Sequence, residues 1–129
     1  EGIYELHAKD LPVVYGNKFQ LHQLFVNLLG NAIKFRKPGA KQIVTVAGDK
    51  LNKSKITFCD NGIGFSQNLS EKIFQVFQRG HNVDSLGGTG IGLAICRKIM
   101  ENHNGKIEAV SREDAGACFH LYFNYGIHN

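Results

Sequence analysis

An apolar segment of the chain ends at a carboxylate that two glycines follow. The letters D-N-G-I-G-F span residues 60–65 and come directly after the strand-like run 55–59. A carboxylate is costly to bury there unless hydrogen-bond donors pair with it, and the exocyclic amine of adenine is such a donor. Gly62 and Gly64 would let the backbone lie against a flat base. These residues predict an adenine site around Asp60, with an aspartate that merely caps the following turn as the alternative.

A second glycine-rich segment, G-G-T-G-I-G-L-A at residues 87–94, opens into a run with helical spacing. The unpaired backbone amides and the positive dipole end of a helix attract anions, so Thr89 to Gly92 could hold phosphates. Neither common phosphate-binding fingerprint fits, because no strand directly precedes these glycines and no G-K-[ST] follows them. Glycines that serve only a tight loop and close helix packing are the alternative.

Two asparagines, Asn27 and Asn31, lie one helical turn apart and so point the same way. Amide oxygens are hard ligands suited to magnesium, which commonly binds through one or two protein groups together with phosphates and water. Lys34 adds a cation for the phosphates three residues beyond Asn31, and Arg79 could do the same from a later segment. The alternative is that these residues only decorate the polar face of a helix.

A long helix must carry the asparagines. Apolar residues recur at helical spacing from Lys18 to about Arg36, behind Asn17 as the predicted N-cap. Pro38 and Gly39 end the pattern. The predicted buried face of this helix consists of Leu21, Leu24, Phe25, Leu28, Ala32 and Phe35.

The other elements complete a two-layer arrangement. Two β-rich runs, 43–47 and 55–59, flank a polar turn and predict an antiparallel pair, of which the second delivers Asp60. Further predicted elements are extended segments at 3–8 and 12–15, a short helix at 68–78, a mobile segment at 79–90, a helix at 91–102, and strands at 106–111 and 118–125. We therefore expect an α/β fold, a two-layer sandwich in which about three helices cover one face of a mixed sheet of about five strands.

Length and charge narrow the class of protein. A chain of 129 residues, 43% hydrophobic, suits one domain with its own core, predicted to span residues 1–129. The net charge of +4 is too small and too scattered for a nucleic-acid-binding surface, so we expect no nucleic-acid partner. No run approaches the roughly 20 apolar residues that cross a bilayer, and we expect no direct membrane contact.

The cysteines are Cys59, Cys96 and Cys118. An odd number without C-x-x-C spacing indicates neither a disulfide framework nor a zinc site. This pattern predicts a reducing compartment, and we expect a cytoplasmic location.

Four segments in series resemble the sequence boxes of sensor histidine kinases. They are N-L-L-G-N-A-I-K-F at 27–35, D-N-G-I-G-F at 60–65, F-Q-V-F-Q-R-G at 74–80 and G-G-T-G-I-G-L-A at 87–94. The match runs in order over nearly the whole chain. It resembles the catalytic ATP-binding domain of these kinases, which implies the Bergerat fold shared with gyrase, chaperone and MutL ATPases, and ATP and magnesium as ligands.

The resemblance also implies roles for single residues. Asn31 becomes the magnesium ligand, Asn27 its neighbour over the phosphates, and Lys34 a phosphate contact. Phe35 falls where an aromatic ring flanks the base that Asp60 reads. Other residues implied in nucleotide binding are Gly62 and Gly64 beside the base, Arg79 near the terminal phosphate, and Gly88, Thr89, Gly90, Gly92 and Leu93 along the phosphate loop.

The activity implied is transfer of the γ-phosphate of ATP to a histidine on a separate helical dimerisation domain, which this chain lacks, with a response regulator downstream. The isolated domain would be nearly inactive. Hydrolytic relatives carry a glutamate at the position of Asn27, so its absence argues for transfer to a protein rather than to water. Many family members carry a threonine where this chain has Cys118. An ATP-hydrolysing relative, a serine-directed anti-sigma kinase and a scaffold that binds no nucleotide are the alternatives.

Overall fold

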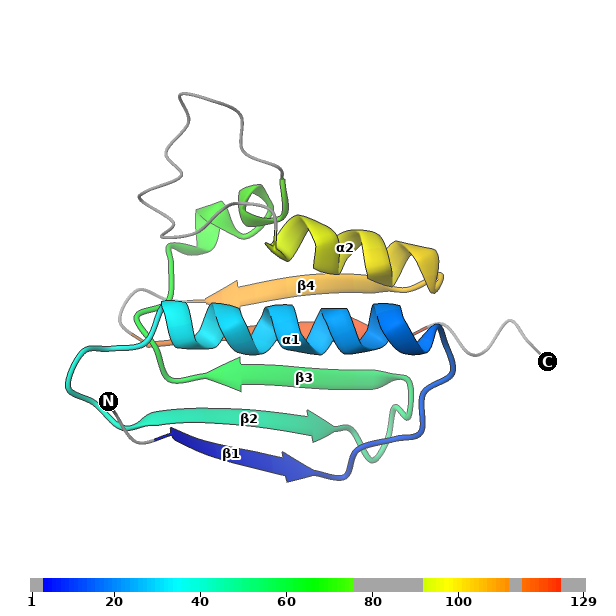
Figure 1. The fold of residues 1–129 in the computed structure, drawn as a ribbon, viewed down its shortest axis with the longest axis horizontal. Coiled ribbons are helices and arrows are strands. Elements are labelled where there is room, and N and C mark those ends of the chain that lie inside the picture. The colour runs from blue at the N-terminus through cyan, green and yellow to red at the C-terminus, as the bar shows by residue number, and fades with distance from the viewer. Residues whose placement is uncertain (1–3, 76–91, 112–114, 124–129) are drawn as a thin grey trace.

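A five-stranded mixed sheet forms one layer of the molecule, in a computed structural model that describes residues 4–75, 92–111 and 115–123 (Figure 1). The strand order is β1-β2-β3-β5-β4. β1 runs parallel to β2, and the other neighbouring strands pair antiparallel. The strands are β1 (Tyr4–Lys9), β2 (Gln42–Gly48), β3 (Lys55–Asp60), β4 (Lys106–Ser111) and β5 (Ala117–Tyr122).

Two helices, α1 (Lys18–Lys34) and α2 (Gly92–Asn102), cover one face of this sheet and pack against each other (Figure 1). Strand side chains alternate between the two faces, and in β5 the residues Ala117, Phe119 and Leu121 are buried while those between them are half-buried. The α1 residues Leu24, Leu28 and Ala32 meet them in the core. The predicted two-layer α/β sandwich with a mixed sheet is therefore confirmed.

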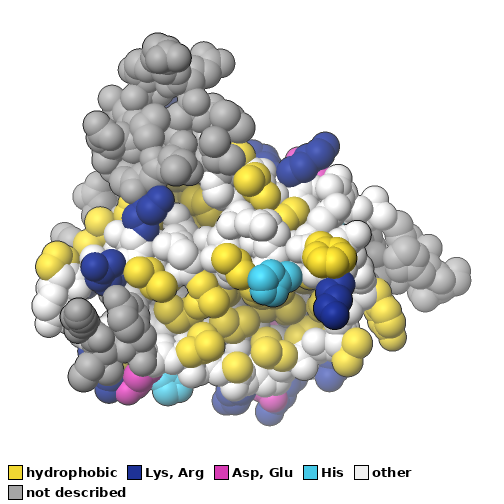
Figure 2. Space-filling model, viewed as in Figure 1, with side chains coloured by type: hydrophobic (Ala, Val, Ile, Leu, Met, Phe, Trp, Pro, Cys, Tyr) yellow, Lys and Arg dark blue, Asp and Glu magenta, His cyan; other side chains and the backbone are white. Residues whose placement is uncertain are grey.

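The helices leave the β1 edge of the sheet uncovered. Hydrophobic side chains gather over α1 and the strands below it (Figure 2), and Leu6, Val26 and Ile33 are among the exposed apolar residues. The fully buried face of α1 is accordingly narrower than the predicted one. Leu24, Leu28 and Ala32 are fully buried, whereas Leu21, Phe25 and Phe35 are half-buried.

A histidine joins the ends of the two helices. Asn17 caps α1 as predicted, because its Oδ1 accepts a hydrogen bond from the backbone amide of Gln20 at 2.9 Å. The backbone amide of Asn17 donates to Nε2 of His103 at 3.0 Å, and Nδ1 of His103 lies 2.7 Å from the carbonyl of Ile99. Both contacts are satisfied by the tautomer that carries its proton on Nδ1. His103 thus fixes the start of α1 to the end of α2.

Two predicted elements differ from the structure. Residues 12–15 form no strand. The segment predicted as a helix at 68–78 forms two short 3₁₀ turns, η1 (Gln67–Leu69) and η2 (Lys72–Phe74), before the described part ends at Gln75. Ile73 and Phe74 are adjacent in the sequence and both buried, so a single tight turn is enough to place them in the core.

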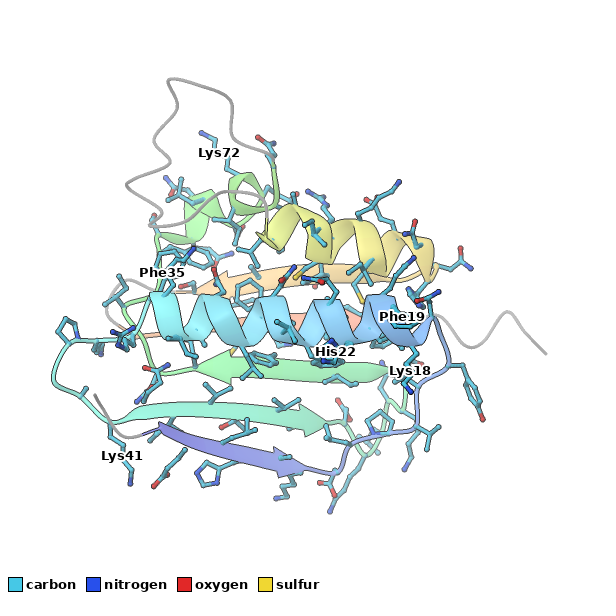
Figure 3. All side chains as sticks on the ribbon, in the orientation of Figure 1. Lys18, Phe19, His22, Phe35, Lys41 and Lys72 are labelled. Atoms are coloured by element: carbon cyan, nitrogen blue, oxygen red, sulfur yellow. A yellow bond between two sulfur atoms is a disulfide. The ribbon has the colours of Figure 1, made fainter. Side chains whose placement is uncertain are left out.

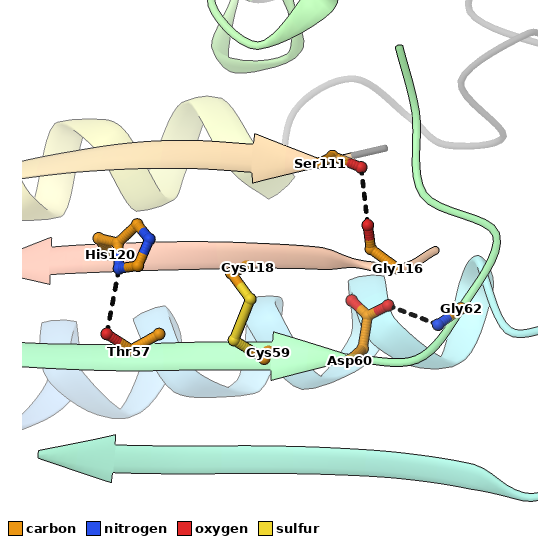
Figure 4. The surroundings of a disulfide bond; sticks show 8 residues. All are labelled: Thr57, Cys59, Asp60, Gly62, Ser111, Gly116, Cys118 and His120. Carbon is orange, nitrogen blue, oxygen red and sulfur yellow. Dashed lines mark hydrogen bonds between the residues drawn. A yellow bond between two sulfur atoms is a disulfide. The ribbon is translucent and has the colours of Figure 1, made fainter. Parts of the chain in front are cut away.

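The cysteine pattern indicated no disulfide framework, and this prediction was wrong. Cys59 and Cys118 form a disulfide across the neighbouring strands β3 and β5 (Figure 4), and Cys96 is a buried free thiol. The two bonded cysteines are 59 positions apart in the chain, but the pairing register places them directly opposite each other. Register follows from the tertiary fold rather than from cysteine spacing, which is why the count was misleading. With two of the three cysteines in a disulfide, the cysteine pattern no longer indicates a reducing compartment.

Candidate nucleotide site

The predicted site residues of the described part gather where α1 and β3 end and α2 begins (Figure 1). Two contacts hold these ends together. The backbone amide of Ile63 donates to the carbonyl of Phe35 at 2.8 Å, which ties the loop after β3 to the end of α1. Nδ2 of Asn27 donates to the carbonyl of Gly92 at 3.3 Å, which ties α1 to the first residue of α2.

Asp60 lies at the end of β3 with a half-buried side chain. Burial raises its pKa above the ordinary value, while hydrogen bonds from the backbone amides of Gly62 and Ala117 act in the opposite direction. The Gly62 amide lies 2.8 Å from Oδ1 (Figure 4). Since burial is the larger effect, a further hydrogen-bond donor would satisfy this group, and an exocyclic amine is one.

The loop after Asp60 requires its first glycine because backbone atoms crowd it. A Cβ at Gly62 would lie 2.3 Å from the backbone oxygen of Phe35 and 3.0 Å from Oδ1 of Asp60. Gly64 adopts a φ of +68°, in the left-handed region that favours glycine. Both glycines of the D-N-G-I-G-F segment therefore serve the path of the loop, and they leave its backbone unobstructed by side chains.

A buried serine anchors the far end of the same loop. Oγ of Ser111 accepts from the backbone amide of Phe65 at 2.8 Å and donates to the carbonyl of Gly116 at 2.9 Å. The backbone amide of Ser111 donates to Oε1 of Gln67 at 2.8 Å. These contacts were not predicted from the sequence. The available indication was that Ser111 occupies the next alternate position after the apolar residues Ile107 and Ala109.

Asn27 is held by contacts on both sides of its amide. Nε2 of Gln23 donates to Oδ1 of Asn27 at 2.8 Å, and Nδ2 of Asn27 donates to Gly92. Beneath it lies Cys96, whose thiol pKa burial raises to about 12, while a hydrogen bond from the Asn27 side chain lowers it by a smaller amount. The role of Gln23 in fixing Asn27 was not predicted from the sequence.

The end of α1 presents the remaining candidates. Phe35 is half-buried at the helix C-terminus (Figure 3), directly after the exposed Lys34. Asn31 is half-buried one turn beyond Asn27. Within the described residues, the side chains of Asn31 and Lys34 make no hydrogen bond or ion pair, so their polar groups are available to a ligand.

Not every predicted site residue can be placed. Gly92 and Leu93 open α2, and Leu93 packs against the core. Arg79, Gly88, Thr89 and Gly90 lie outside the described residues. The parts of the chain that the structure covers contain no cluster of three or more His, Cys, Asp or Glu side chains that could hold a metal, and no helix long and apolar enough to cross a membrane.

At one end the two-layer α/β sandwich carries a half-buried aspartate, a glycine loop and an asparagine-bearing helix, the arrangement expected of a nucleotide-binding domain with the Bergerat fold. Comparison with known proteins identifies the family. The chain belongs to the histidine kinase-, DNA gyrase B- and HSP90-like ATPase family, whose model matches residues 16–127. Within that family it is a catalytic ATPase domain of the histidine kinase type.

Curated proteins with similar sequences include sensory kinases and phytochromes. The chain is 45% identical over 116 residues to cyanobacterial phytochrome A of Nostoc sp., a match that covers 90% of the chain and 15% of that protein. It is 38% identical over 113 residues to the adaptive-response sensory kinase SasA of Rippkaea orientalis, covering 88% of the chain and 29% of that protein. The chain thus spans less than a third of the length of these relatives.

Solved structures share the same fold. The catalytic domain of the histidine kinase ThkA matches with a TM-score of 0.71 at 29% identity, over 94% of this chain and 78% of that one. The mycobacterial sensor histidine kinase MprB matches with a TM-score of 0.75 at 24% identity, over 93% of this chain and 80% of that one. The expected fold and the resemblance to histidine kinases are thereby confirmed.

Proposed function

We propose that this chain binds Mg·ATP and transfers the γ-phosphate to a histidine on a helical dimerisation domain, as the catalytic module of a two-component signalling kinase. The proposal rests on Asp60, a half-buried carboxylate that accepts a hydrogen bond from the Gly62 amide at the end of β3. Its remaining lone pairs suit the amine of adenine and would repel the acceptor that guanine presents there.

The donor set fits magnesium in the way this ion usually binds. Mg²⁺ prefers oxygen ligands and keeps waters and substrate phosphates in its shell, so one protein group is sufficient. We assign that group to the amide oxygen of Asn31, whose side chain has no partner within the described residues. Bound magnesium would neutralise charge on the phosphates. Lys34, one turn further along α1, is assigned to the phosphates as a second cation.

Transfer to a protein is favoured over hydrolysis by the chemistry of Asn27. Hydrolysis requires a general base for water, and an amide is not one. The Oδ1 atom of Asn27 is already engaged by Gln23, so Asn27 acts here as a positioning residue between α1 and Gly92. The histidine nitrogen of the partner would attack the γ-phosphorus while the bond to the bridging oxygen breaks and ADP leaves. The chain contributes orientation and charge stabilisation.

The proposed phosphotransfer also requires partner proteins and a compartment that contains ATP. The acceptor histidine would lie on a dimerisation domain of the same protein, and a response regulator would receive the phosphate from it. We further propose a cytoplasmic location, where ATP is available, and no contact of this domain with nucleic acid. By itself the domain is expected to release almost no phosphate.

A phosphotransfer assay tests the proposed function. When this chain, labelled Mg·ATP and the helical phosphoacceptor domain are mixed, we expect label on the helical domain as an acid-labile, base-stable phosphate. Asn31→Ala is the variant for the magnesium assignment, and we expect it to reduce labelling at least about tenfold. Steady release of inorganic phosphate by the chain alone would instead indicate a hydrolase, and acid-stable phosphoserine would indicate a serine-directed kinase.

Gln23→Ala is expected to weaken ATP binding about two- to tenfold, because the amide of Asn27 loses the hydrogen bond that orients it. The unfolding temperature should change little, since Gln23 is exposed. His22→Ala is the matched control, because His22 is the adjacent exposed residue of the same helix (Figure 3). Calorimetric titration with Mg·ATP makes the comparison, and equal affinities for the two variants would contradict the positioning role.

A further inference from the structure

The disulfide between Cys59 and Cys118 lies on the face of the sheet opposite the helices (Figure 4). In β3 the buried residues are Ile56 and Phe58, and Cys59 points the other way. In β5 the same alternation places Cys118 on the face opposite the core. Both cysteines are half-buried, so the bond is not sealed inside the core, whereas the free thiol of Cys96 is.

The bond is next to the proposed adenine-reading residue on both strands. Cys59 immediately precedes Asp60, and Cys118 immediately follows Ala117, whose backbone amide hydrogen-bonds the Asp60 carboxylate. Asp60 and Ala117 are themselves opposite each other in the β3–β5 pairing. The disulfide therefore links the two backbone segments that hold this carboxylate, from the face of the sheet opposite the site.

The disulfide also fixes the distance between β3 and β5 at this rung. The Cα atoms of Cys59 and Cys118 are 4.1 Å apart. Breaking the bond removes this covalent link and frees β3 and β5 to move relative to each other at the rung beside Asp60. The next rung of the same face is held by Thr57 and His120, whose Oγ1 and Nδ1 atoms are 3.1 Å apart, so the change would be concentrated at the site end.

We propose that Cys59 and Cys118 form a thiol–disulfide exchange site, and that the bridged form binds nucleotide more tightly than the dithiol form. The co-reactant is a dithiol, either a small molecule or a redox protein. One thiolate of the dithiol attacks a sulfur of the bridge, forms a mixed disulfide and releases the other cysteine. Its second thiolate then displaces the remaining cysteine, so the dithiol leaves as a disulfide and both cysteines end as thiols.

The affinity part of this proposal depends on the proposed nucleotide site, and its physical basis is preorganisation. A carboxylate fixed before binding loses less conformational freedom when the ligand arrives. Because the expected movement is small, the dithiol form should bind about three- to tenfold more weakly. Cys96 takes no part, since burial raises its thiol pKa to about 12 and keeps it protonated and inaccessible.

Alkylation tests the exchange site without reference to nucleotide. The full chain is treated with oxidised glutathione or with dithiothreitol, then unfolded and alkylated with iodoacetamide. We expect mass spectrometry to show alkylation of Cys96 alone in the oxidised protein and of all three cysteines in the reduced protein. Alkylation of all three after oxidation would overturn the exchange site.

Calorimetric titration with Mg·ADP then tests the coupling to nucleotide. The oxidised chain should bind three- to tenfold more tightly than the reduced chain. The double variant C59S/C118S, which retains Cys96, should have the affinity of the reduced chain and ignore reductant. Cys118→Thr provides a second unbridged chain should the double variant fail to fold. Equal affinities in the two redox states would overturn the coupling alone, whereas absence of binding in both would overturn the coupling together with the proposed function.

Discussion

Asp60→Asn is expected to weaken nucleotide binding at least about 100-fold while the protein stays folded. Asparagine keeps one side-chain oxygen, and the backbone amide of Gly62 requires it. The group facing the base then becomes an NH₂, so two donors meet where the carboxylate accepted a charge-assisted hydrogen bond. Loss of such a bond costs about 1.5–3 kcal/mol, and leaving a buried donor unpaired adds to this. Titration of Mg·ATP into both proteins measures the change.

The stability of Asp60→Asn distinguishes a lost site from a lost fold. Burial raises the pKa of Asp60 in the folded protein, so the ionised form is disfavoured and destabilises the fold above the folded-state pKa. This cost disappears as the pH falls and the carboxyl is protonated. Removing the charge should therefore leave the unfolding temperature at neutral pH equal or higher. A large fall in this temperature would contradict the account.

A second aspartate supplies the matched control. The pKa of Asp49 is lowered because the backbone amides of Leu51 and Asn52 hydrogen-bond its carboxylate. Its stabilising contribution is present above the unfolded-state pKa and is lost as the pH falls through the folded-state pKa. Asp49→Asn should then lower stability slightly at neutral pH and leave nucleotide affinity unchanged. Both substitutions replace a carboxylate with an amide. A loss of nucleotide affinity in Asp60→Asn but not in Asp49→Asn would therefore show that the loss is specific to the proposed site.

Nucleotide affinity itself should depend on pH through Asp60. Oδ1 accepts from the Gly62 amide, and only the ionised carboxylate is an acceptor at both oxygens, so that the other can accept from the amine. Because burial raises the Asp60 pKa, affinity should begin to fall at a higher pH than the usual value of about 3.9 for aspartate would give.

Local sequence patterns were enough to predict the elements that carry the site. The helical spacing from Lys18, the cap at Asn17 and the paired β runs that end at Asp60 all appear in the structure within a few residues. These signals are short in range, because capping, periodicity and turns depend on neighbours only a few positions away. The glycines after Asp60 were informative for the same reason.

Contacts between distant segments were not predictable in this way. The Cys59–Cys118 bond depends on the register of β3 against β5, and the Ser111 contacts depend on where the loop after Asp60 passes β4. Both are set by how the layers pack, and a change of one position in register would move every side chain to the other face. The hydrogen bond from Gln23 to Asn27 lies within one helix. Its role could not be predicted, because it depends on the long-range hydrogen bond from Asn27 to Gly92.

Gly62→Ala is expected to destabilise the fold and weaken nucleotide binding together. The added Cβ would lie 2.3 Å from the backbone oxygen of Phe35, which accepts the amide of Ile63 and cannot rotate away. The loop must therefore move and pull Asp60 with it. Overpacking of this kind costs about 1–3 kcal/mol. We expect the unfolding temperature to fall by roughly 5–15 °C, and binding to weaken even at temperatures where the variant is folded.

Gly30→Ala is the control within the same structure. No atom lies within 4 Å of a Cβ at Gly30, an exposed position in the middle of α1. Alanine is favoured over glycine in a helix by up to about 1 kcal/mol, so this variant should be more stable than the native chain. The same added methyl group thus has opposite effects at the two positions. A Gly62→Ala protein as stable as the native chain would show that the loop can move away from α1, and the fixed position assigned to Asp60 would then be wrong.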